Sequence, residues 1–537
     1  MSTLAIEHLT IGLPEGADRP FAVEDVSMTI DKWQILCVVG ESGSGKSMTA
    51  NALMGLLPRG VTVKAGRAMF EGRDVIRLPE AEKMALRGAQ VAMIFQEPMT
   101  ALNPLMRIGD QIAEVFAAHD RFTQSDRRKK ALDLIREVQL PDPEKIIRAY
   151  PFQLSGGQRQ RAMIAMALAL EPKLLIADEP TTALDVTTQA QILKLILDLR
   201  DRRGMAVMFI THDFGVVAEI ADHVIVMREG RIVEQGNARD VLENPQHDYT
   251  RTLLDAIPTG RVPQNAPVED APALELRNLT KVYRTGGGLM RKAREVTAVD
   301  NVSLTIARGE VLGLVGESGS GKSTLGRAVV RLVNPDGGQI LVGGTDLASL
   351  GEDELRRQRH KVQMVFQDPY ASLNPRQRII RAITDGPIAR GVPKRDAQAR
   401  ARELLEIVGL GADAADRYPN EFSGGQRQRI GIARALAMDP ELIIADEAVS
   451  ALDVSIQAQV LDLLRDLRQR LKLSILFITH DLRVAAQLCD RIAVMQNGRL
   501  VEVGAVRDVF LSPQKEYTRS LLAAVPGADW ARENAPA

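Results

Sequence analysis

Two identical eight-residue segments, GESGSGKS at 40–47 and again at 316–323, carry the clearest chemistry in the sequence. Each follows a short apolar run and precedes a helix-like stretch, so its glycines allow backbone N–H groups to surround phosphate oxygens at the start of a helix. The spacing is that of a P-loop, in which Lys46 and Lys322 should reach the β- and γ-phosphates of a nucleotide. The predicted phosphate-binding residues are Gly40, Glu41, Ser42, Gly43, Ser44, Gly45, Lys46, Ser47 and Met48 in the first copy, and Gly316, Glu317, Ser318, Gly319, Ser320, Gly321, Lys322, Ser323 and Thr324 in the second.

An Asp-Glu pair ends an apolar run in each half of the chain, Asp178 with Glu179 and Asp446 with Glu447. A buried strand would bring each pair to the carboxyl end of a parallel sheet, where such sheets bind their ligands. The first carboxylate suits coordination of Mg²⁺, directly or through water, and the second suits polarising an attacking water. Taken alone, such a pair could instead cap the N-terminus of a helix. The predicted Mg²⁺ ligands are Ser47, Gln96, Asp178, Ser323, Gln367 and Asp446.

His212 and His480 each follow an apolar run and precede an aspartate, at the same distance from the Asp-Glu pair of their half. A neutral imidazole near the γ-phosphate can hydrogen-bond the phosphate and the water while the glutamate remains ionised. Gln96 and Gln367 end β-like segments and can link Mg²⁺ and the nucleotide to the segment that follows. The predicted catalytic residues are Glu179, His212, Glu447 and His480.

A second glycine turn, SGGQ, stands at the start of another helix-like stretch in each half, at 155–158 and 423–426. Ser and two glycines at a helix start make a further anion-binding turn, but the P-loop of the same half already surrounds the phosphates. We therefore expect this turn to serve a different nucleotide. Its residues are Ser155, Gly156, Gly157 and Gln158 in the first half, and Ser423, Gly424, Gly425 and Gln426 in the second.

The two halves of the chain are copies of one another, and each carries the same series of motifs. FQEPMTALNP at 95–104 returns as FQDPYASLNP at 366–375, and the glycine turns, the Asp-Glu pairs and the ITHD segments return in the same order. The repeat predicts a first domain at 1–257 and a second at 274–537, joined by a linker at 258–273 that is rich in Pro and small residues.

The elements within each copy predict an α/β fold. Short apolar runs such as ILCVVG and KLLIAD alternate with helix-like stretches, which is the pattern of a mostly parallel sheet covered on both faces. The segments at about 99–170 and 370–438 differ, since they are rich in Arg, Glu, Ala and Leu at helical spacing. Each copy is therefore expected to be a P-loop nucleotide-binding domain with a mostly parallel core sheet and an inserted helical subdomain.

Composition limits the remaining classes of function. With 68 Lys+Arg against 69 Asp+Glu, the net charge of -1 gives no indication of nucleic-acid binding. The longest apolar run, 162–170, is much shorter than the ~20 residues that cross a bilayer, so any membrane role should be peripheral. Two cysteines form neither a disulfide framework nor a cysteine-rich metal cluster, and cytoplasm is the expected compartment.

LSGGQ at 154–158 stands between the glutamine and the Asp-Glu pair, and the other motifs follow the same order in both halves. With this set of motifs, nearly all of both halves resembles the ATP-binding cassette (ABC) ATPases. The resemblance implies ATP hydrolysis with Mg²⁺ and two domains that dimerise head to tail around two ATP molecules. Lys46 would then share its ATP with Ser423 to Gln426, and Lys322 would share its ATP with Ser155 to Gln158.

Three places depart from the family pattern. Phe422 replaces the leucine before the second SGGQ, and Ala448 with Val449 stands where the first copy has Pro and Thr, although Glu447 is retained. The aromatic residue that stacks on adenine in this family resembles Tyr283 in the second copy. The aligned residue in the first copy is Leu13, with Phe21 as the nearest aromatic substitute, which leaves adenine stacking at the first site open.

The end of each half points to one branch of the family. NPQHDYTRTLLDAIP at 244–258 and SPQKEYTRSLLAAVP at 512–526 resemble the tails of the oligopeptide, dipeptide and nickel importer ATPases, here of the fused type found in microcin C and oligopeptide importers. The resemblance implies two transmembrane permease subunits, a solute-binding protein reached through them, and a peripheral place on the cytoplasmic face of the inner membrane. Some relatives hold an iron–sulfur cluster in the tail, but no cysteine lies there in this sequence.

The alternative is a soluble tandem ABC ATPase acting on ribosomes or DNA. Ribosome-acting relatives usually carry a long charged linker, and DNA-repair relatives carry inserted metal or coiled-coil domains, whereas the linker here is short and the insertions are compact. The sequence therefore favours an energy-coupling importer subunit for peptides or peptide-like solutes, with the solute left open among oligopeptide, dipeptide, microcin-like peptide and nickel.

Overall fold

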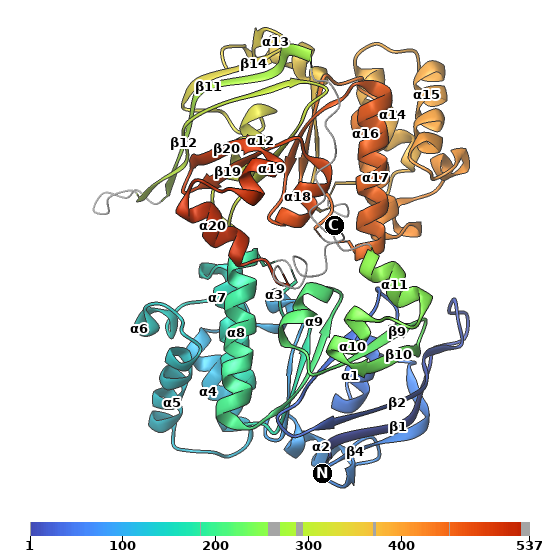
Figure 1. Cartoon of the computed structure of the whole chain (residues 1–537), viewed down its shortest axis with the longest axis vertical. Coiled ribbons are helices and arrows are strands. Elements are labelled where there is room, and N and C mark those ends of the chain that lie inside the picture. Colours follow the sequence, from blue (N-terminus) through green and yellow to red (C-terminus); the bar gives the residue numbers. More distant parts are fainter. Residues whose placement is uncertain are drawn as a thin grey trace. The chain divides into compact units, whose positions relative to one another are not determined.

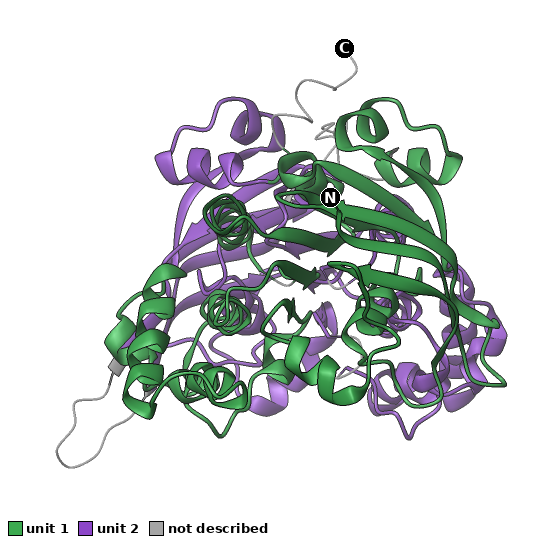
Figure 2. Cartoon of the chain, turned by 90° about the horizontal axis from the view of Figure 1, so that it is seen from below, with its two compact units in different colours: residues 1–257, 526–537 green, residues 258–525 purple. Residues whose placement is uncertain are grey.

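The computed structural model describes residues 2–182, 184–255, 269–285, 294–368, 372–450 and 452–527. The chain divides into two compact units, coloured separately in Figure 2: unit 1 is residues 1–257 with 526–537, and unit 2 is residues 258–525. Most of the expected linker at 258–273 lies outside the described residues. Its last five residues belong to strand β11 (Glu269–Thr285).

A six-stranded sheet forms the centre of unit 1, with strand order β10-β9-β3-β8-β7-β6. All neighbours are parallel except β10, which runs antiparallel to β9. Every residue of β3, β7 and β8 is buried, as expected for strands covered by helices on both faces. The strands are β3 (Ile35–Val39), β6 (Val91–Ile94), β7 (Leu174–Asp178), β8 (Ala206–Thr211), β9 (His223–Arg228) and β10 (Arg231–Asn237).

The parallel order explains why motifs far apart in the sequence meet. The P-loop follows β3, the Asp-Glu pair ends β7, and Gln96 and His212 come just after β6 and β8. Carboxyl ends of parallel strands lie at one edge of a sheet, so this edge of unit 1 carries the P-loop, the acidic pair, the glutamine and the histidine together.

Beside the core sheet lies an antiparallel sheet that the sequence patterns did not predict, with order β2-β1-β4-β5. Its core face includes Leu4, Ile6, Leu9 and Ile11 of β1, all buried. The register shifts between Ile6 and Leu9, where His8 adopts a φ of +52°. This bulge returns Leu9 to the core face and interrupts the two-residue alternation that identifies a strand. The strands are β1 (Ser2–Gly12), β2 (Phe21–Asp31), β4 (Thr62–Phe70) and β5 (Arg73–Asp74).

Helices complete unit 1 and form the expected insertion between β6 and β7. In Figure 1 the helices α4 to α6 stand beside α7, at one side of the sheet. Helix α7 packs against α3, α4, α5 and α8. The helices are α1 (Lys46–Met54), α2 (Glu80–Leu86), α3 (Pro98–Ala101), α4 (Ile108–Ala118), α5 (Gln124–Glu137), α6 (Pro143–Ile146), α7 (Gly156–Ala167), α8 (Val186–Arg203), α9 (Phe214–Ile220), α10 (Ala238–Glu243) and α11 (Asp248–Asp255).

Unit 2 repeats this architecture, with a core sheet in the order β16-β17-β18-β13-β19-β20 and an antiparallel sheet in the order β12-β11-β14-β15. Its further strands are β12 (Arg294–Arg308), β13 (Val311–Val315), β14 (Gly337–Val342), β15 (Thr345–Asp346), β16 (Val362–Val365), β17 (Leu442–Asp446), β18 (Ser474–Ile478), β19 (Arg491–Gln496) and β20 (Arg499–Ala505). Its helices are α12 (Lys322–Val329), α13 (Glu352–Gln358), α14 (Ile379–Ala389), α15 (Lys394–Ile407), α16 (Gly424–Leu436), α17 (Val454–Leu471), α18 (Leu482–Leu488), α19 (Val506–Leu511) and α20 (Glu516–Ala523).

The predicted fold class is confirmed in both units. Across the described ranges, none of the helices combines the length and apolar character that a membrane span requires.

Candidate functional site

The P-loop joins β3 to α1 in unit 1, and its backbone can be built only with glycine at two places. Gly40 has a φ of +150°, and a Cβ there would lie 2.2 Å from the carbonyl oxygen of Met227. Gly45 has a φ of +102°, and its Cβ would lie 2.6 Å from the carbonyl oxygen of Ala22. The loop therefore packs directly against two neighbouring strands and delivers the first N–H groups of α1 to the edge of the sheet.

The P-loop lysines are buried and point back into their own loops. Lys46 Nζ donates to the carbonyl oxygens of Gly40 at 2.6 Å and Glu41 at 2.8 Å. Lys322 Nζ donates to Gly316 at 2.7 Å and to Glu317 at 2.8 Å. Each ammonium group is thus held within the loop that is expected to surround the phosphates, so a bound phosphate could take over part of its hydrogen bonding.

The serine that follows each P-loop lysine contacts the aspartate of the Asp-Glu pair in its own unit. Ser47 Oγ donates to Asp178 Oδ1 at 2.9 Å, and Ser323 Oγ donates to Asp446 Oδ1 at 2.8 Å. Both aspartates are buried, and burial raises their pKa values despite the serine hydrogen bonds. The structure therefore brings together two of the three predicted Mg²⁺ ligands in each unit.

The second carboxylate accepts hydrogen bonds from the glutamine and lies within ion-pair distance of the histidine. Gln96 Nε2 donates to Glu179 Oε2 at 3.0 Å, and His212 Nδ1 lies 3.3 Å from the same oxygen. In unit 2, Gln367 Nε2 donates to Glu447 Oε2 at 2.6 Å, and His480 Nδ1 lies 3.5 Å from Oε1. We call these groups the Gln–Glu–His clusters.

A strained backbone holds each of these glutamates at the end of its strand. Glu179 has a φ of +45° and Glu447 has a φ of +49°, a conformation that costs non-glycine residues energy. Their N–H groups donate to the carbonyl oxygens of Ile210 and Ile478 on the neighbouring strands. This backbone turns each glutamate side chain toward the glutamine and the histidine.

The electrostatics of the clusters favour ionised glutamates. Burial alone would raise the pKa of Glu179, but the hydrogen bond and charge of His212, together with Lys46, outweigh it and lower the pKa to about 2. Burial and His480 oppose each other in the same way at Glu447, whose pKa is also lowered. Burial would lower the pKa of His480, yet Glu447 raises it above the ordinary value. Glu447 therefore favours the protonated form of the His480 imidazole, and burial opposes it.

The SGGQ turns form the first turns of α7 and α16. Ser155 Oγ accepts from the N–H of Gln158 at 3.3 Å, and Gln158 Oε1 accepts from the N–H of Ser155 at 3.0 Å. Ser423 and Gln426 form the same reciprocal cap. A Cβ on Gly157 would lie 2.4 Å from the side chain of Thr188 in α8, so the turn needs glycine there for close packing. These hydrogen bonds hold the turn itself and do not join it to a Gln–Glu–His cluster.

The region expected to meet adenine differs between the units. Tyr283 lies on β11 with 39% of its surface exposed, and Lys281 Nζ stands 5.7 Å from its ring centroid. In unit 1, Leu13 directly follows β1 and packs partly buried against the antiparallel sheet, while Phe21 begins β2 opposite Gly12. The two units therefore present different side chains at the aligned position.

Sequence reasoning missed two kinds of residue near the P-loops. Arg19, in the turn between β1 and β2, donates to the carbonyl oxygen of Gly43. Tyr249 and Tyr517, in the tail helices α11 and α20, accept hydrogen bonds from P-loop N–H groups. Arg19 belongs to no sequence motif. The tyrosines, in contrast, lie in a Tyr-Thr-Arg segment that is repeated in both tails, and this repeat could have identified them.

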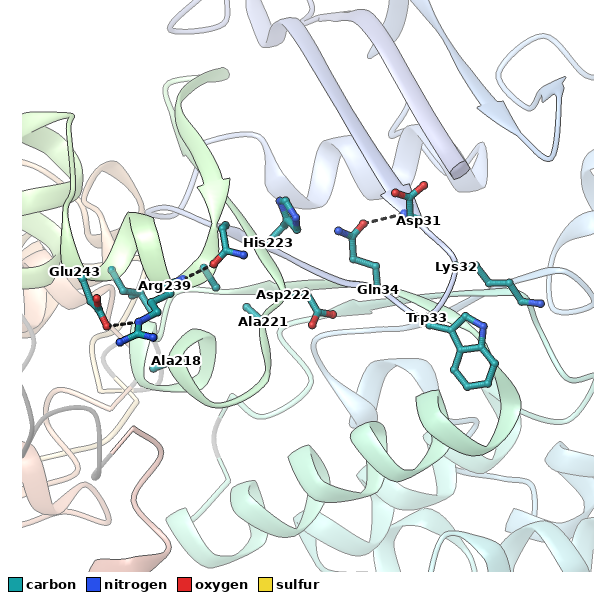
Figure 3. Close-up of a pocket in the computed structure, with 13 residues that line it drawn as sticks. Asp31, Lys32, Trp33, Gln34, Ala218, Ala221, Asp222, His223, Arg239 and Glu243 are labelled. Carbon is teal, nitrogen blue, oxygen red and sulfur yellow. Dashed lines mark hydrogen bonds and ion pairs between the residues drawn. The ribbon is translucent and has the colours of Figure 1, made fainter. Parts of the chain in front are cut away.

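A groove of about 800 Å³ in unit 1 lies away from this site (Figure 3). It is lined by residues before β3 and β9 and after β10, among them Trp33, Asp222 and Arg239. These positions are at the amino ends of the parallel strands, opposite the edge that carries the P-loop. Arg239 Nε donates there to Glu243 Oε1 at 2.8 Å.

Comparisons with known proteins show the family of the chain. A family model described as ABC transporter matches residues 23–182 and 299–450, and one described as Oligopeptide/dipeptide transporter, C-terminal region, matches residues 233–282. The glutathione import ATP-binding protein GsiA of Shigella boydii serotype 4 (strain Sb227) is 48% identical over 99% of this chain and 91% of its own length. The GsiA protein of Escherichia coli (strain K12) is 47% identical over the same shares.

Among solved structures, cbiO1 from Clostridium perfringens, part of the ABC transporter complex cbiONQ, is 25% identical, with a TM-score of 0.41 over 49% of this chain and all of its own. The chain belongs to the ABC transporter family. Within that family it is an ATP-hydrolysing ATP-binding protein of the oligopeptide/dipeptide importer type, with two cassettes in one chain. The alternative of a ribosome- or DNA-acting ATPase is not favoured.

Proposed function

We propose that this chain couples ATP hydrolysis to the import of peptides or peptide-like solutes through two permease subunits that receive the solute from a binding protein. The observation that carries the proposal is the duplicated Gln–Glu–His cluster beside a P-loop, in a chain whose first tail matches the oligopeptide/dipeptide transporter region. Relatives are named for glutathione import, so we propose a short peptide of that size as the first solute to test.

Each cluster is suited to activating water for attack on the γ-phosphate. We propose that ionised Glu179 and Glu447 polarise the attacking water. We propose also that His212 and His480 form hydrogen bonds with the γ-phosphate. The lysines Lys46 and Lys322 would bind the β- and γ-phosphates while keeping part of their hydrogen bonding to the loop carbonyls. A pKa near 2 keeps Glu179 ready to accept a hydrogen bond from water throughout the physiological pH range.

The oxygen ligands at each P-loop fit Mg²⁺. Ser47 and Asp178, like Ser323 and Asp446, present hard oxygen atoms beside the phosphate-binding loop, and a bound cation would offset the burial that raises the pKa of each aspartate. Mg²⁺ typically uses only one or two carboxylates when nucleotide phosphates supply other ligands. When bound there, the ion would neutralise phosphate charge, and Gln96 and Gln367 would be further ligands.

From the resemblance to the family we also propose that each ATP is shared, with Lys46 and the second SGGQ turn at one site and Lys322 and the first SGGQ turn at the other. The reciprocal caps leave the serine and glycine residues of both turns at helix starts, as an anion-binding turn requires.

We propose that the segments after Gln96 and Gln367 grip the permease. In unit 1 large apolar side chains are exposed within this segment and directly before it: Phe95 is 39%, Met99 49% and Leu105 85% exposed. Exposed apolar side chains that form one patch mark a site for a protein partner. Residues 369–371 of the second segment lie outside the described residues. A peripheral place on the cytoplasmic face of the membrane follows from this proposal.

The test is reconstitution of the chain with its permease and binding protein in vesicles, with transport of a radiolabelled tripeptide and ATP hydrolysis measured together. Glu97→Lys with Asp368→Lys should reduce transport at least several-fold while the free chain keeps most of its ATPase activity. Asp240→Lys with Asp508→Lys makes the same charge change at exposed positions of α10 and α19 and should leave transport unchanged. If the first variant shows unchanged permease binding, transport and ATP stoichiometry, these segments do not couple ATP hydrolysis to the permease.

A further inference from the structure

The tail helices reach the P-loops through one tyrosine each. The hydroxyl of Tyr249 in α11 accepts a hydrogen bond from the N–H of Glu41 at 3.3 Å. The hydroxyl of Tyr517 in α20 accepts from the N–H of Glu317 at the same distance. Each pair is separated by about two hundred residues of sequence, and both contacts lie at the second residue of the P-loop. The duplication shows that the contact is part of the architecture of each unit.

The tyrosine and the P-loop lysine hold opposite sides of one peptide group. The carbonyl oxygen of Gly40 accepts from Lys46 Nζ at 2.6 Å, and the N–H of the same peptide group, on Glu41, donates to Tyr249. The described chain has no cis peptide bond, so this C=O and this N–H point in opposite directions. Rotation of the peptide group would break both hydrogen bonds. The tyrosine therefore fixes the carbonyl that orients the lysine.

The second unit repeats this arrangement with its own residues. The carbonyl oxygen of Gly316 accepts from Lys322 Nζ at 2.7 Å, and the N–H of Glu317 donates to Tyr517. The family model of the oligopeptide/dipeptide transporter tail matches only residues 233–282, in the first half and the start of the second. The structure nevertheless gives both tails the same contact with a P-loop.

Each tyrosine is placed by a short turn tied to the neighbouring strand. Glu234 of β10 accepts from the N–H groups of Gln246 and His247, at 2.7 and 3.1 Å. Glu502 of β20 accepts from Gln514 and Lys515, at 2.8 and 3.2 Å. These bonds set the start of each tail helix directly before the tyrosine. The side-chain amides of Gln246 and Gln514 also donate to main-chain carbonyl oxygens two residues earlier, which gives a physical reason for the repeated glutamine.

Tyr249 is well packed and neutral. It is 7% exposed, and the guanidinium of Arg228 lies 4.9 Å from its ring centroid. Burial raises the pKa of Tyr249 to about 12, so the hydroxyl keeps its proton and accepts the N–H as a neutral group. The Tyr249 side chain can therefore hold the tail helix and the P-loop at a fixed separation.

We infer that the tail helices are positioning elements of the ATP sites, and that Tyr249 and Tyr517 are positioning residues that hold the P-loop in its phosphate-binding form. The inference rests on the proposed role of Lys46 and Lys322 in binding phosphate. The tails would thereby set the affinity for ATP without touching the nucleotide, in addition to marking the transporter branch.

The test removes only the two hydroxyls, as Tyr249→Phe with Tyr517→Phe in the full chain. Loss of the hydroxyl, which in Tyr249 contacts both the N–H and the side chain of Glu41, should raise the KM for ATP about three- to tenfold while kcat changes less than about twofold. Tyr150→Phe with Tyr418→Phe is the matched control, because these duplicated tyrosines lie in the helical insertions. The control should leave KM unchanged.

Hydrogen exchange of the nucleotide-free protein supplies a second measurement. Peptides covering 40–47 and 316–323 should exchange faster in the tail variant than in the wild type or the control. Glu234→Gln with Glu502→Gln, which loosens the turns but keeps both tyrosines, should move KM and exchange in the same direction by less. An unchanged KM overturns the inference, including the case in which only the thermal stability falls.

A separate variant distinguishes this inference from the proposed function. Lys46→Ala with Lys322→Ala should abolish tight ATP binding. If it does and the tyrosine variant behaves as wild type, only the tail inference fails. If the lysine variant still binds ATP normally, the assignment of the phosphate-binding loops fails.

Discussion

The two cassettes agree around the P-loops and the proposed catalytic glutamates, and they differ at the position expected to meet adenine. Lys46 and Lys322 contact the same loop carbonyls, and both glutamates are hydrogen-bonded by a glutamine. Behind Glu179, Thr182 Oγ1 donates to the carboxylate at 3.0 Å. Ser450 Oγ donates to the main-chain oxygen of Glu447 at 3.0 Å, and its hydroxyl also helps to lower the pKa of that carboxyl. The groups around each P-loop and glutamate are therefore repeated closely.

The adenine regions show the larger difference. Unit 2 offers the exposed ring of Tyr283, while unit 1 has the aliphatic Leu13 at the aligned position and places Arg19 on the P-loop carbonyl of Gly43. A planar guanidinium can stack on an aromatic base, as a phenol ring can. We therefore expect the two sites to bind the same phosphates with different contacts to the base.

The largest effect is expected from the histidines, which the two units share. His212→Ala with His480→Ala should lower kcat at least ~10²-fold, because each cluster loses the group beside its ionised glutamate. Steady-state ATP hydrolysis by the purified chain measures this, and ATP binding should persist. If either single variant alone accounts for the whole loss, the two clusters are not equivalent.

Sharing of the sites is tested next, in a Lys322→Ala background that leaves only the site built on Lys46. Ser423→Arg should lower the remaining hydrolysis about tenfold or more, because it blocks the proposed partner turn of that site. Ser155→Arg is the matched control and should have little further effect, since it belongs to the site already lost. Equal effects of the two arginines would break the shared-site model.

A smaller effect is expected from the adenine regions. Tyr283→Ala should weaken ATP binding at the second site about three- to tenfold, while Tyr283→Phe should preserve it, because stacking uses the ring and not the hydroxyl. Arg19→Ala should weaken the first site by a similar factor. Titration with a fluorescent ATP analogue, with the other site disabled at its P-loop lysine, separates the two. No change in Arg19→Ala would leave Leu13 and Phe21 as the contacts to test.

The smallest effect concerns the His480–Glu447 pair in the nucleotide-free protein. The raised pKa of His480 contributes stability that is present below the ordinary value of 6.5 and is lost as pH rises through the raised value. The lowered pKa of Glu447 contributes above 4.5 and is lost as pH falls through the lowered value. Glu447→Gln should therefore lower the Tm by an amount that shrinks as the pH rises through the raised pKa of His480, by about 2 °C in all. A loss that stays constant at every pH above 6.5 would contradict the charged pair.

The sequence was sufficient to predict that the motif residues lie together, because each motif follows a strand of a parallel sheet. The P-loop, the Asp-Glu pairs, Gln96 and His212 were predicted individually, and the parallel sheet then places them at one edge. Their contacts could not be predicted, because the bond between Gln96 and Glu179 depends on a backbone φ of +45° that no residue pattern specifies.

The elements that were missed share a physical cause. The antiparallel sheet escaped because the bulge at His8 breaks the alternation between Ile6 and Leu9. Arg19 and Tyr249 act through contacts made by chain folding over long sequence separations, to Gly43 and Glu41 respectively. Such contacts produce no periodic pattern in the local sequence. The repetition of the tail sequence in both halves did, however, indicate that the tail has a function.

Hydrolysis of ATP by both units, each with its own glutamate, is the central claim, and one series of variants tests it most directly. Glu179→Gln, Glu447→Gln and the double variant keep the side-chain size while removing the ionised carboxylate. ATP turnover and the number of bound ATP molecules per chain are measured for all three. We predict that each single variant loses a large part of the activity, that the double variant turns over at least ~10²-fold more slowly, and that all still bind two ATP molecules. Near-normal turnover in the double variant, or one single variant equal to the wild type while the other equals the double, would contradict the claim.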